Sequence, residues 1–192
     1  MKYTAKDYGN LIGMKGFSDT LLNNHFTAYQ GYVTNTNKLL DSLFVMFKEG
    51  KVATPEYAEL KRRLSFEFNG MRLHDYYFEN LGGTGHSDKS GRLVKKLTEE
   101  FGSYDDWRKD FNATATMRGI GWTILYRDNI TGNLINQWIN EHETGHLAGC
   151  IPLLVLDVFE HAFMIDYGLK RADYIGAFFN NINWSAVEAR FR

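Results

Sequence analysis

Two long helical patterns, separated by one short break, constrain the fold of this chain more than any other feature. From Asp19 to Phe47, apolar residues recur mostly at three- and four-residue steps, and Ser18 precedes them as a predicted N-cap. Glu49-Gly50-Lys51 interrupts the pattern. Thr54-Pro55 then starts a second helix, with the threonine as N-cap and the proline at the first helical position. Long helices joined by such a short loop pack against each other, so an antiparallel hairpin is predicted.

The second half of the chain has a different periodicity. The second helix is expected to stop at Gly82-Gly83, and the polar, glycine-rich segment 82–87 is the predicted boundary between an N-terminal domain (1–83) and a C-terminal domain (84–192). Alternation over residues 122–126 indicates a strand. The fold class is therefore α+β: a long antiparallel helical hairpin, then an α/β half with a small three-stranded antiparallel sheet. Its strands are expected at residues 122–126, 134–139 and 153–157, and its helices around residues 93–101, after Ser103, and around residues 163–169, 174–180 and 185–191.

Composition excludes several classes of function. The 192 residues carry a net charge of −1 and show no basic stripe, which argues against a nucleic-acid partner. Cys150 is the single cysteine, so the chain forms no internal disulfide and no thiolate metal site. No apolar run approaches the roughly 20 residues of a membrane helix. The first residues lack the apolar core of a signal peptide, so a cytoplasmic location without a membrane partner is expected.

The segment with the clearest chemistry is Asp157 to His161, which follows the apolar run 152–156. A carboxylate at the end of a buried strand is costly unless it is paired or bound to a metal. His25 and His74 lie on the two predicted helices. A lone histidine on an apolar helix face is more often a packed core residue, and the spacing of Asp157 and His161 is a weak pattern by itself. The combination of a helix pair with one histidine each and a strand end with Asp and His favours a metal site for iron, manganese or zinc.

Several motifs give the chain a resemblance to the iron/manganese superoxide dismutases. The family's C-terminal signature is D-x-W-E-H-A, followed by a closing helix that ends in N-x-x-N-W. Weaker motifs of the family are Y-V-N-x-x-N in the first helix, F-G-S, and G-S-G-W. The matching segments are Leu156–Phe163 with Asp166-Tyr167, Asp173–Trp184, Tyr32-Val33 with Asn35 and Asn37, Phe101–Ser103, and Gly119–Trp122.

The resemblance implies a site residue by residue. It makes Tyr32 the gateway tyrosine of the substrate channel and Trp122 a wall of the active site. Glu160 becomes the glutamate that reaches across a dimer interface to the partner's metal-binding histidine, and its alternative role is that of an ordinary surface acid. The expected assembly is a homo-oligomer, a dimer with the metal sites near the interface, with a tetramer as the alternative. The implied metal ligands, completed by a solvent molecule, are His25, His74, Asp157 and His161.

A further outer-sphere residue is implied by one branch of this family, in which a histidine hydrogen-bonds the metal-bound solvent in place of glutamine. That histidine stands fifteen residues before the metal-binding Asp, which is the separation of His142 and Asp157. Gly70 matches the small residue of forms whose donor comes from the second half. His146 is the alternative donor, and it can equally be a plain loop histidine.

The chain also departs from the family pattern. The spacing from His25 to Tyr32 is one residue short, and Asn24 occupies the ungapped ligand position. Because seven residues are nearly two helical turns, His25 and Tyr32 can share a face, which favours a one-residue deletion that keeps His25 as ligand. Phe159 replaces the tryptophan of the signature. Met164 stands where the family often has a tyrosine that bonds a first-helix histidine of the partner, and that histidine is also missing.

The function implied by the resemblance is superoxide dismutation. Redox cycling of one Fe or Mn ion per subunit converts superoxide to oxygen and hydrogen peroxide, and the ligand set is common to both metals. Arg72 and Arg171 are candidates for attracting the anion. The altered residues around the ligands motivate an alternative, a metal-binding structural homologue with weak or no dismutase activity. A metal hydrolase is less favoured, because no extra general base is evident beside the ligands.

Overall fold

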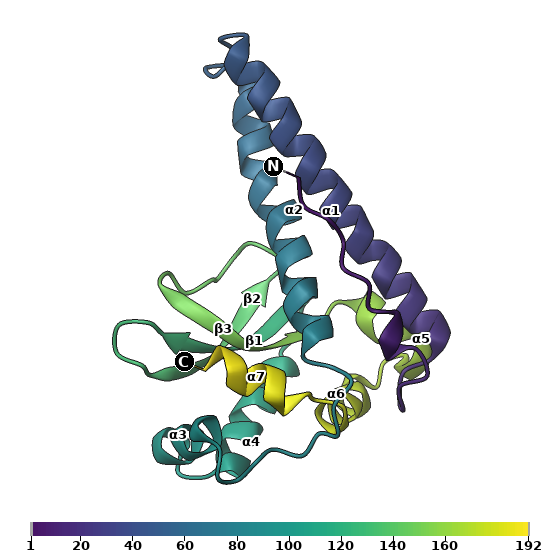
Figure 1. Cartoon of the computed structure of the whole chain (residues 1–192), viewed down its shortest axis with the longest axis vertical. Coiled ribbons are helices and arrows are strands. Elements are labelled where there is room, and N and C mark those ends of the chain that lie inside the picture. Colours follow the sequence, from purple (N-terminus) through teal and green to yellow (C-terminus); the bar gives the residue numbers. More distant parts are fainter. Residues whose placement is uncertain (1, 192) are drawn as a thin grey trace.

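A long helical hairpin stands on an α/β body in the computed structural model, which describes residues 2–191 (Figure 1). Helix α1 spans Asp19–Lys48 and helix α2 spans Pro55–Glu79. The Ser18 hydroxyl accepts a hydrogen bond from the backbone N–H of Leu21, and the Thr54 hydroxyl accepts one from that of Tyr57. Both N-caps predicted from the sequence are confirmed, because capping depends on residues only three positions apart.

The C-terminal half confirms the α+β class. Its three strands form one antiparallel sheet in the order β2-β1-β3, with α4 packed against β1 and β2, and with α2 and α7 packed against β3 (Figure 1). The boundary at residues 83 and 84 stays a prediction. The elements after the hairpin are α3 (Arg92–Phe101), α4 (Tyr104–Ala115), β1 (Gly121–Asp128), β2 (Leu134–Asn140), β3 (Cys150–Asp157), the 3-10 turn η2 (Glu160–Ala162), α5 (Met164–Tyr167), α6 (Arg171–Asn180) and α7 (Trp184–Arg190); a further 3-10 turn, η1 (Gly9–Leu11), precedes the hairpin.

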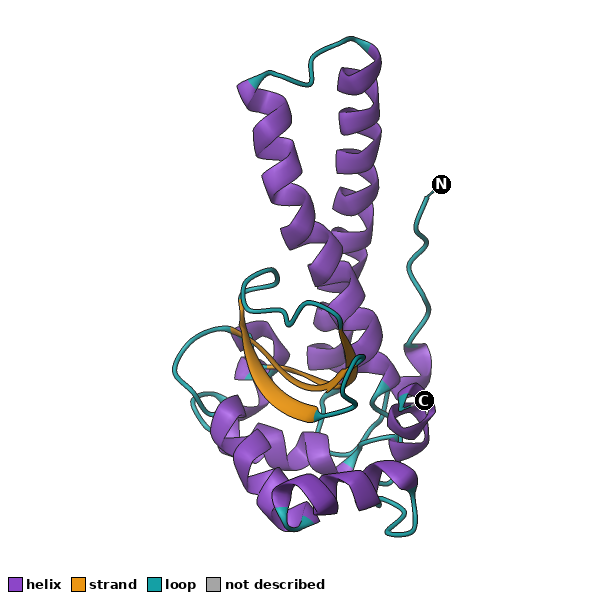
Figure 2. Cartoon of the chain, turned by 90° about the vertical axis from the view of Figure 1, so that its left-hand side faces the viewer, coloured by secondary structure: helices purple, strands orange, loops and turns teal. Residues whose placement is uncertain are grey.

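The central strand β1 is buried on both faces, which the alternating pattern did not predict. Trp122 to Tyr126 are all buried, including Thr123. The reason is tertiary: β1 lies between β2 and β3, and helices cover both sides of the curved sheet (Figure 2). A strand in this position needs apolar residues on both faces.

Several element boundaries differ from the predicted ones. Helix α2 ends at Glu79, three residues before Gly82, and α5 is limited to Met164–Tyr167. Strand β3 starts at Cys150 and includes Pro152, which pairs with Tyr126 directly after a register shift in β1. Proline fits there because β3 is an edge strand and the ladder is already irregular at that point.

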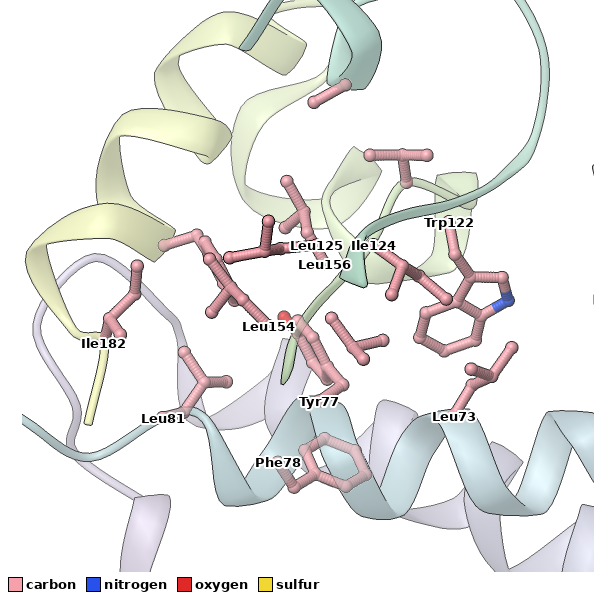
Figure 3. Close-up of a cluster of buried hydrophobic side chains, with 14 of the residues drawn as sticks. Leu73, Tyr77, Phe78, Leu81, Trp122, Ile124, Leu125, Leu154, Leu156 and Ile182 are labelled. Carbon is pink, nitrogen blue, oxygen red and sulfur yellow. The ribbon is translucent and has the colours of Figure 1, made fainter. Parts of the chain in front are cut away.

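The apolar core joins α2 to the sheet (Figure 3). Leu73, Tyr77 and Phe78 of α2 are buried in the cluster that contains Trp122 of β1 and Leu156 of β3. Burial of these large side chains is the main favourable contribution to folding. It also fixes the relative position of His74, which lies on α2, and of the C-terminal end of β3.

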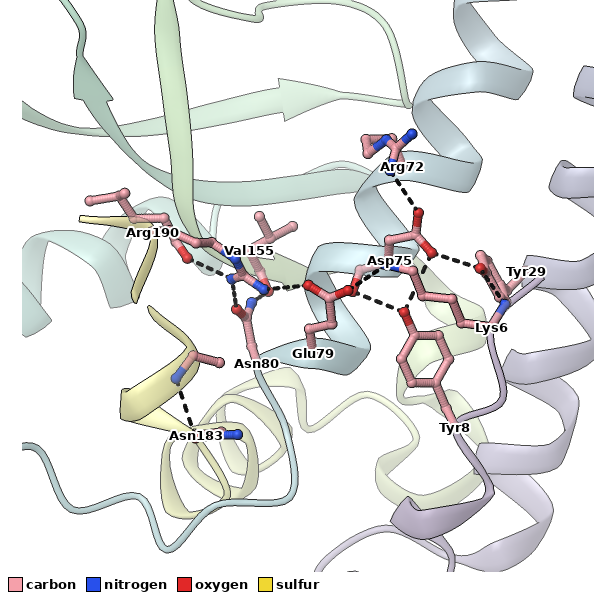
Figure 4. Close-up of polar contacts among 12 residues, drawn as sticks. Lys6, Tyr8, Tyr29, Arg72, Asp75, Glu79, Asn80, Val155, Asn183 and Arg190 are labelled. Carbon is pink, nitrogen blue, oxygen red and sulfur yellow. Dashed lines mark hydrogen bonds and ion pairs between the residues drawn. The ribbon is translucent and has the colours of Figure 1, made fainter. Parts of the chain in front are cut away.

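A polar network ties the N-terminal segment to the hairpin (Figure 4). The buried Asp75 carboxylate accepts hydrogen bonds from the Tyr29 hydroxyl at 2.6 Å, from Arg72 at 3.1 Å and from the Tyr8 hydroxyl at 3.4 Å. Glu79, one turn later, pairs with Lys6 and Arg190. Because Arg72 is paired with a buried carboxylate, its charge is largely compensated within this network.

Candidate metal centre

Four side chains from four elements converge at the junction of the hairpin and the sheet. His25 comes from α1, His74 from α2, Asp157 from the last position of β3 and His161 from η2. Their potential ligand atoms all lie within 4.8 Å of one another. Residues separated by up to 136 positions therefore form one cluster, which has the composition inferred from the sequence.

The three imidazoles surround one carboxylate oxygen. Asp157 Oδ2 lies 3.1 Å from Nε2 of His25, 3.2 Å from Nε2 of His161 and 3.6 Å from Nε2 of His74. The other oxygen, Oδ1, accepts a hydrogen bond from the backbone N–H of Phe159 at 2.8 Å. The Tyr174 hydroxyl donates to the Asp157 carbonyl at 2.7 Å. These bonds fix the carboxylate so that Oδ2 faces the histidines.

The hydrogen bonding of the His74 ring suits a metal ligand. Its Nδ1–H donates to the carbonyl of Gly70 at 2.6 Å, so in the neutral ring Nε2 carries a lone pair. This Nε2 is buried, and among residues 2–191 it has no hydrogen-bond partner. A buried nitrogen without a partner is unfavourable, and a cation at the centre of the cluster would satisfy it. A backbone carbonyl that orients the opposite ring nitrogen is typical of histidine ligands.

Charges in the cluster are arranged to favour cation binding. Burial lowers the pKa of His25 and, together with the neighbouring histidines, lowers that of His74 well below its ordinary value. Both rings are therefore neutral and can donate lone pairs. Burial disfavours the Asp157 anion, but the charge of His161 and the hydrogen bonds from His161 and His25 outweigh this effect and lower the pKa of Asp157. The same carboxylate raises the pKa of His161 against the effect of burial.

The exposure of His25 and of Asn24 decides which of them can be the ligand from the first helix. His25 is buried and faces Asp157, whereas Asn24 is exposed. Tyr32 lies on the same side of the regular helix α1, and its ring is 5.2 Å from that of His74. A helix without a bulge therefore brings His25 and Tyr32 to the same cluster, as a seven-residue step allows.

A hydrogen-bonded chain lies beside the cluster. Trp122 Nε1–H donates to Nδ1 of His142 at 3.0 Å, so the neutral His142 ring carries its proton on Nε2. That nitrogen lies 2.8 Å from the Tyr32 hydroxyl and donates to it. Burial lowers the pKa of His142 to about 4 and raises the pKa of Tyr32 to about 12. Both groups are consequently uncharged near neutral pH.

The rival histidine, His146, lies further away and contacts the loop. Its Nε2–H donates to the backbone carbonyl of His142 at 2.9 Å, and its Nδ1 accepts from the Tyr126 hydroxyl at 2.7 Å. Both ring nitrogens are thereby occupied. The geometry makes His146 a residue that positions His142, whereas the His142 ring itself faces Tyr32.

One side of the cluster is open to the surface. His161 is about one-third exposed, with 33% of its side-chain surface accessible, while His25, His74 and Asp157 are closed off. Glu160 and Met164, next to His161 in the chain, are both exposed. Among residues 2–191, no hydrogen bond is made to Nδ1 of His161. This side therefore offers a ring nitrogen, a carboxylate and an apolar side chain to any partner that covers it.

Two phenylalanines pack against His142, and the sequence singled out only one of them. Phe66 packs edge-on against His142, with ring centroids 4.6 Å apart. Phe159, which replaces the tryptophan of the signature, stacks on His142 at 4.7 Å and on His161 at 5.2 Å, so it fills the space between them. Phe66 has no sequence signal beyond its apolar character. Arg171, a predicted steering residue, donates instead to the carbonyls of Met117 and Gly119.

Comparison with known proteins assigns the family. Residues 89–190 match the C-terminal domain of the iron/manganese superoxide dismutases. This match covers more than half of the chain and includes Asp157 and His161. The chain therefore belongs to the iron/manganese superoxide dismutase family, as the sequence motifs predicted.

Individual relatives extend the similarity to the hairpin. The iron superoxide dismutase of Aquifex pyrophilus is 38% identical, over 99% of this chain and 91% of its own length. That of Saccharolobus solfataricus is 36% identical, over 91% of this chain and 85% of its own. A manganese superoxide dismutase of Haloferax volcanii is 34% identical, over 87% of this chain and 82% of its own. Both metals thus occur among relatives of similar identity.

Proposed function

We propose that this protein is a superoxide dismutase that converts superoxide to oxygen and hydrogen peroxide with one bound iron or manganese ion. The observation that carries the proposal is the convergence of three imidazole nitrogens on Oδ2 of Asp157, with one of them, Nε2 of His74, buried and unpartnered within the described chain. Imidazole and carboxylate ligands suit both metals, and such an ion supplies the one-electron chemistry that superoxide needs. Relatives named for each metal support the same assignment.

The ligand roles follow from the cluster. His25, His74, Asp157 and His161 would hold the ion, and a single carboxylate leaves the site net positive toward an anion. The identity of the metal, iron or manganese, is determined by analysing the metal that the purified protein carries and by testing which of the two restores activity. No helix within residues 2–191 combines the length and the apolar character needed to cross a bilayer. The cytoplasmic location expected from the sequence stays a prediction.

Proton delivery is the proposed task of Tyr32 and His142. The reduction of superoxide to peroxide consumes two protons, and Tyr32 of α1 brings a hydroxyl beside the cluster, with its ring stacked on that of His74 at 5.2 Å. Because His142 donates to the tyrosine oxygen, the phenol proton is free to point toward the site. Trp122 holds the His142 ring in the tautomer that this requires.

A homodimer is the proposed assembly. Glu160 is exposed, and it directly precedes His161, whose side chain is one-third exposed. In a two-fold pair, each carboxylate can accept a hydrogen bond from the other subunit's ligand histidine. Such a bond would fix the ring and its tautomer, as carboxylates next to ligand histidines do.

The test is dismutase activity of metal-analysed protein. The wild type is loaded with iron or with manganese, and inhibition of superoxide-driven dye reduction is measured. His74→Ala is expected to lose the metal and the activity, whereas His86→Ala, which alters an exposed loop histidine, should retain both. Full activity in His74→Ala would refute the ligand assignment. A metal-replete but inactive wild type would favour the alternative of a structural homologue.

A further inference from the structure

An arginine that the sequence did not single out lies on the helix that carries His74. Arg63 and His74 are eleven residues apart on α2, so they share one face of the helix and lie about 16 Å apart along its axis. Phe66 occupies the intervening turn and contacts His142. The Arg63 guanidinium lies over the Phe66 ring, 4.0 Å from its centroid. Arg63 is thus linked by direct contacts to the Tyr32–His142 pair.

The buried carboxylate of Glu67 sets the direction of the Arg63 side chain. Helical side chains normally lean toward the N-terminus of the helix, which would take Arg63 away from His74. Instead, Nε and Nη2 of Arg63 donate to Oε1 of Glu67 at 3.0 Å and 2.8 Å, one turn closer to the site. Asn35 of α1 donates to the other Glu67 oxygen at 3.3 Å. The guanidinium is therefore drawn back toward the cluster and held there.

In the Arg63–Glu67 ion pair, the guanidinium lies at the surface and the carboxylate is buried. The Arg63 side chain is 47% exposed, whereas that of Glu67 is only 6% exposed. At long range the two charges cancel, but at short range an approaching anion meets the guanidinium first. The positive charge of Arg63 also acts on the interior, where it opposes the rise that burial causes in the pKa of Tyr32 and adds to the lowering that burial causes in the pKa of His142. The other candidate arginines differ in place: Arg72 pairs with Asp75 in the network that joins the N-terminal segment to the hairpin, and Arg171 donates to backbone carbonyls.

We propose that Arg63, oriented by Glu67 and Phe66, is the cationic docking point at which the superoxide anion is captured before it reaches the Tyr32–His142 pair. The inference rests on the proposed function for the identity of the anion. Arg63 acts locally, and it neither binds the metal nor transfers a proton. Its loss should therefore weaken the capture of small anions while leaving metal content unchanged.

The experiment compares charge-matched variants of the metal-loaded protein. Arg63→Gln alone would leave Glu67 buried without its partner, so the central variant is Arg63→Gln with Glu67→Gln, which leaves net charge unchanged. Arg62→Gln is the control, because Arg62 is its exposed neighbour and pairs with the exposed Glu59 instead of with Glu67. Arg63→Lys keeps the charge but loses the fork that binds Glu67.

Two readouts are measured: kcat/KM for superoxide by pulse radiolysis, and azide affinity by optical titration of the iron-loaded protein. The double variant is expected to lose between about twofold and about seventeenfold in each, the range for one unit charge about 10 Å from an anion between bulk-water and surface screening, and the simultaneous loss of the Glu67 charge places the result near the lower end. Arg63→Lys should retain part of the effect, and Arg62→Gln should match the wild type. Azide affinity and kcat/KM equal to those of Arg62→Gln would overturn the role of Arg63.

The azide titration also separates this inference from the proposed function. A metal-replete wild type without dismutase activity would defeat superoxide as the substrate, while the azide affinities would still decide whether Arg63 captures small anions. Equal azide affinities in an active enzyme would defeat Arg63 alone. Metal content and far-UV circular dichroism of each variant establish that the comparison is made between folded, loaded proteins.

Discussion

Replacement of Gly70 by alanine should separate the activity of this protein from its stability. Gly70 lies within α2, one turn before His74, and the Tyr32 ring packs directly on it. An alanine Cβ would lie 2.6 Å from Cδ1, 2.8 Å from Cε1 and 2.9 Å from Cγ of Tyr32. Ordinary van der Waals contact begins at about 3.4 Å. The ring must therefore retreat by about 0.8 Å, which is the difference between 3.4 and 2.6 Å.

This displacement of the Tyr32 ring is large enough to break the hydrogen bond between Tyr32 and His142. The Tyr32 hydroxyl lies 2.8 Å from Nε2 of His142, and a displacement of this size would take it to about 3.6 Å, beyond hydrogen-bonding range. Loss of one such bond costs about 1 kcal/mol. Alanine in place of glycine within a helix returns about 1 kcal/mol. The free energy of unfolding should therefore change by less than about 1 kcal/mol, while activity falls about tenfold or more because a positioned proton donor is lost.

Gly31→Ala is the matched control. Gly31 lies in α1, and an added Cβ there meets no atom within 4 Å, so the substitution should stabilise the protein by about 0.5–1 kcal/mol without affecting activity. Urea unfolding of the metal-free proteins gives the stability, and pulse radiolysis of the loaded proteins gives the activity. If Gly70→Ala is as active as Gly31→Ala at equal metal content, the Tyr32–His142 bond is not part of proton delivery.

Three further predictions concern pH, metal and assembly. Because the pKa of His142 is lowered to about 4 in the folded state, the unfolded chain binds one more proton than the folded chain between about pH 4 and 6.5, and the stability of the metal-free protein should rise with pH in that window. His142→Gln should reduce the slope of this rise by up to about 1.4 kcal/mol per pH unit. An unchanged slope in urea titrations would contradict this prediction. Metal loading should raise the melting temperature of the wild type but not of His74→Ala, as calorimetry before and after chelation can show. Glu160→Gln should shift the proposed dimer toward monomer in analytical ultracentrifugation, whereas Glu56→Gln should not, and equal dissociation of both variants would argue against a bond across the interface.

Features that depend on near neighbours in the chain could be predicted without a structure. The caps at Ser18 and Thr54 each need a hydroxyl and a backbone N–H three residues apart, and both form as expected. The hairpin and the antiparallel strands follow from periodicity and turn residues. The composition of the His25, His74, Asp157 and His161 cluster also followed, because the motif at Asp157 marks the family and the helices each carry an inward histidine.

Other properties depend on which residues from distant segments become neighbours. The pattern at β1 could not reveal that both faces are buried, since this depends on where β2, β3 and the helices pack. Spacing favoured His142 but left His146 as an alternative, because the distinction is which ring faces Tyr32, 110 residues away. The sequence offered Arg72 and Arg171 as steering residues and did not single out Arg63.

The sequence by itself determined the class of fold, the helix starts and the ligand set, since these depend on local chemistry and on a motif kept in the chain. The tertiary structure alone decided which neighbours each charged side chain has and toward which part of the molecule it is held. Arg72 is paired with the buried Asp75, whereas Arg63 is drawn toward the cluster by the buried Glu67. Burial and pairing are properties of packed neighbours, and for that reason they emerge only when the hairpin and the sheet come together.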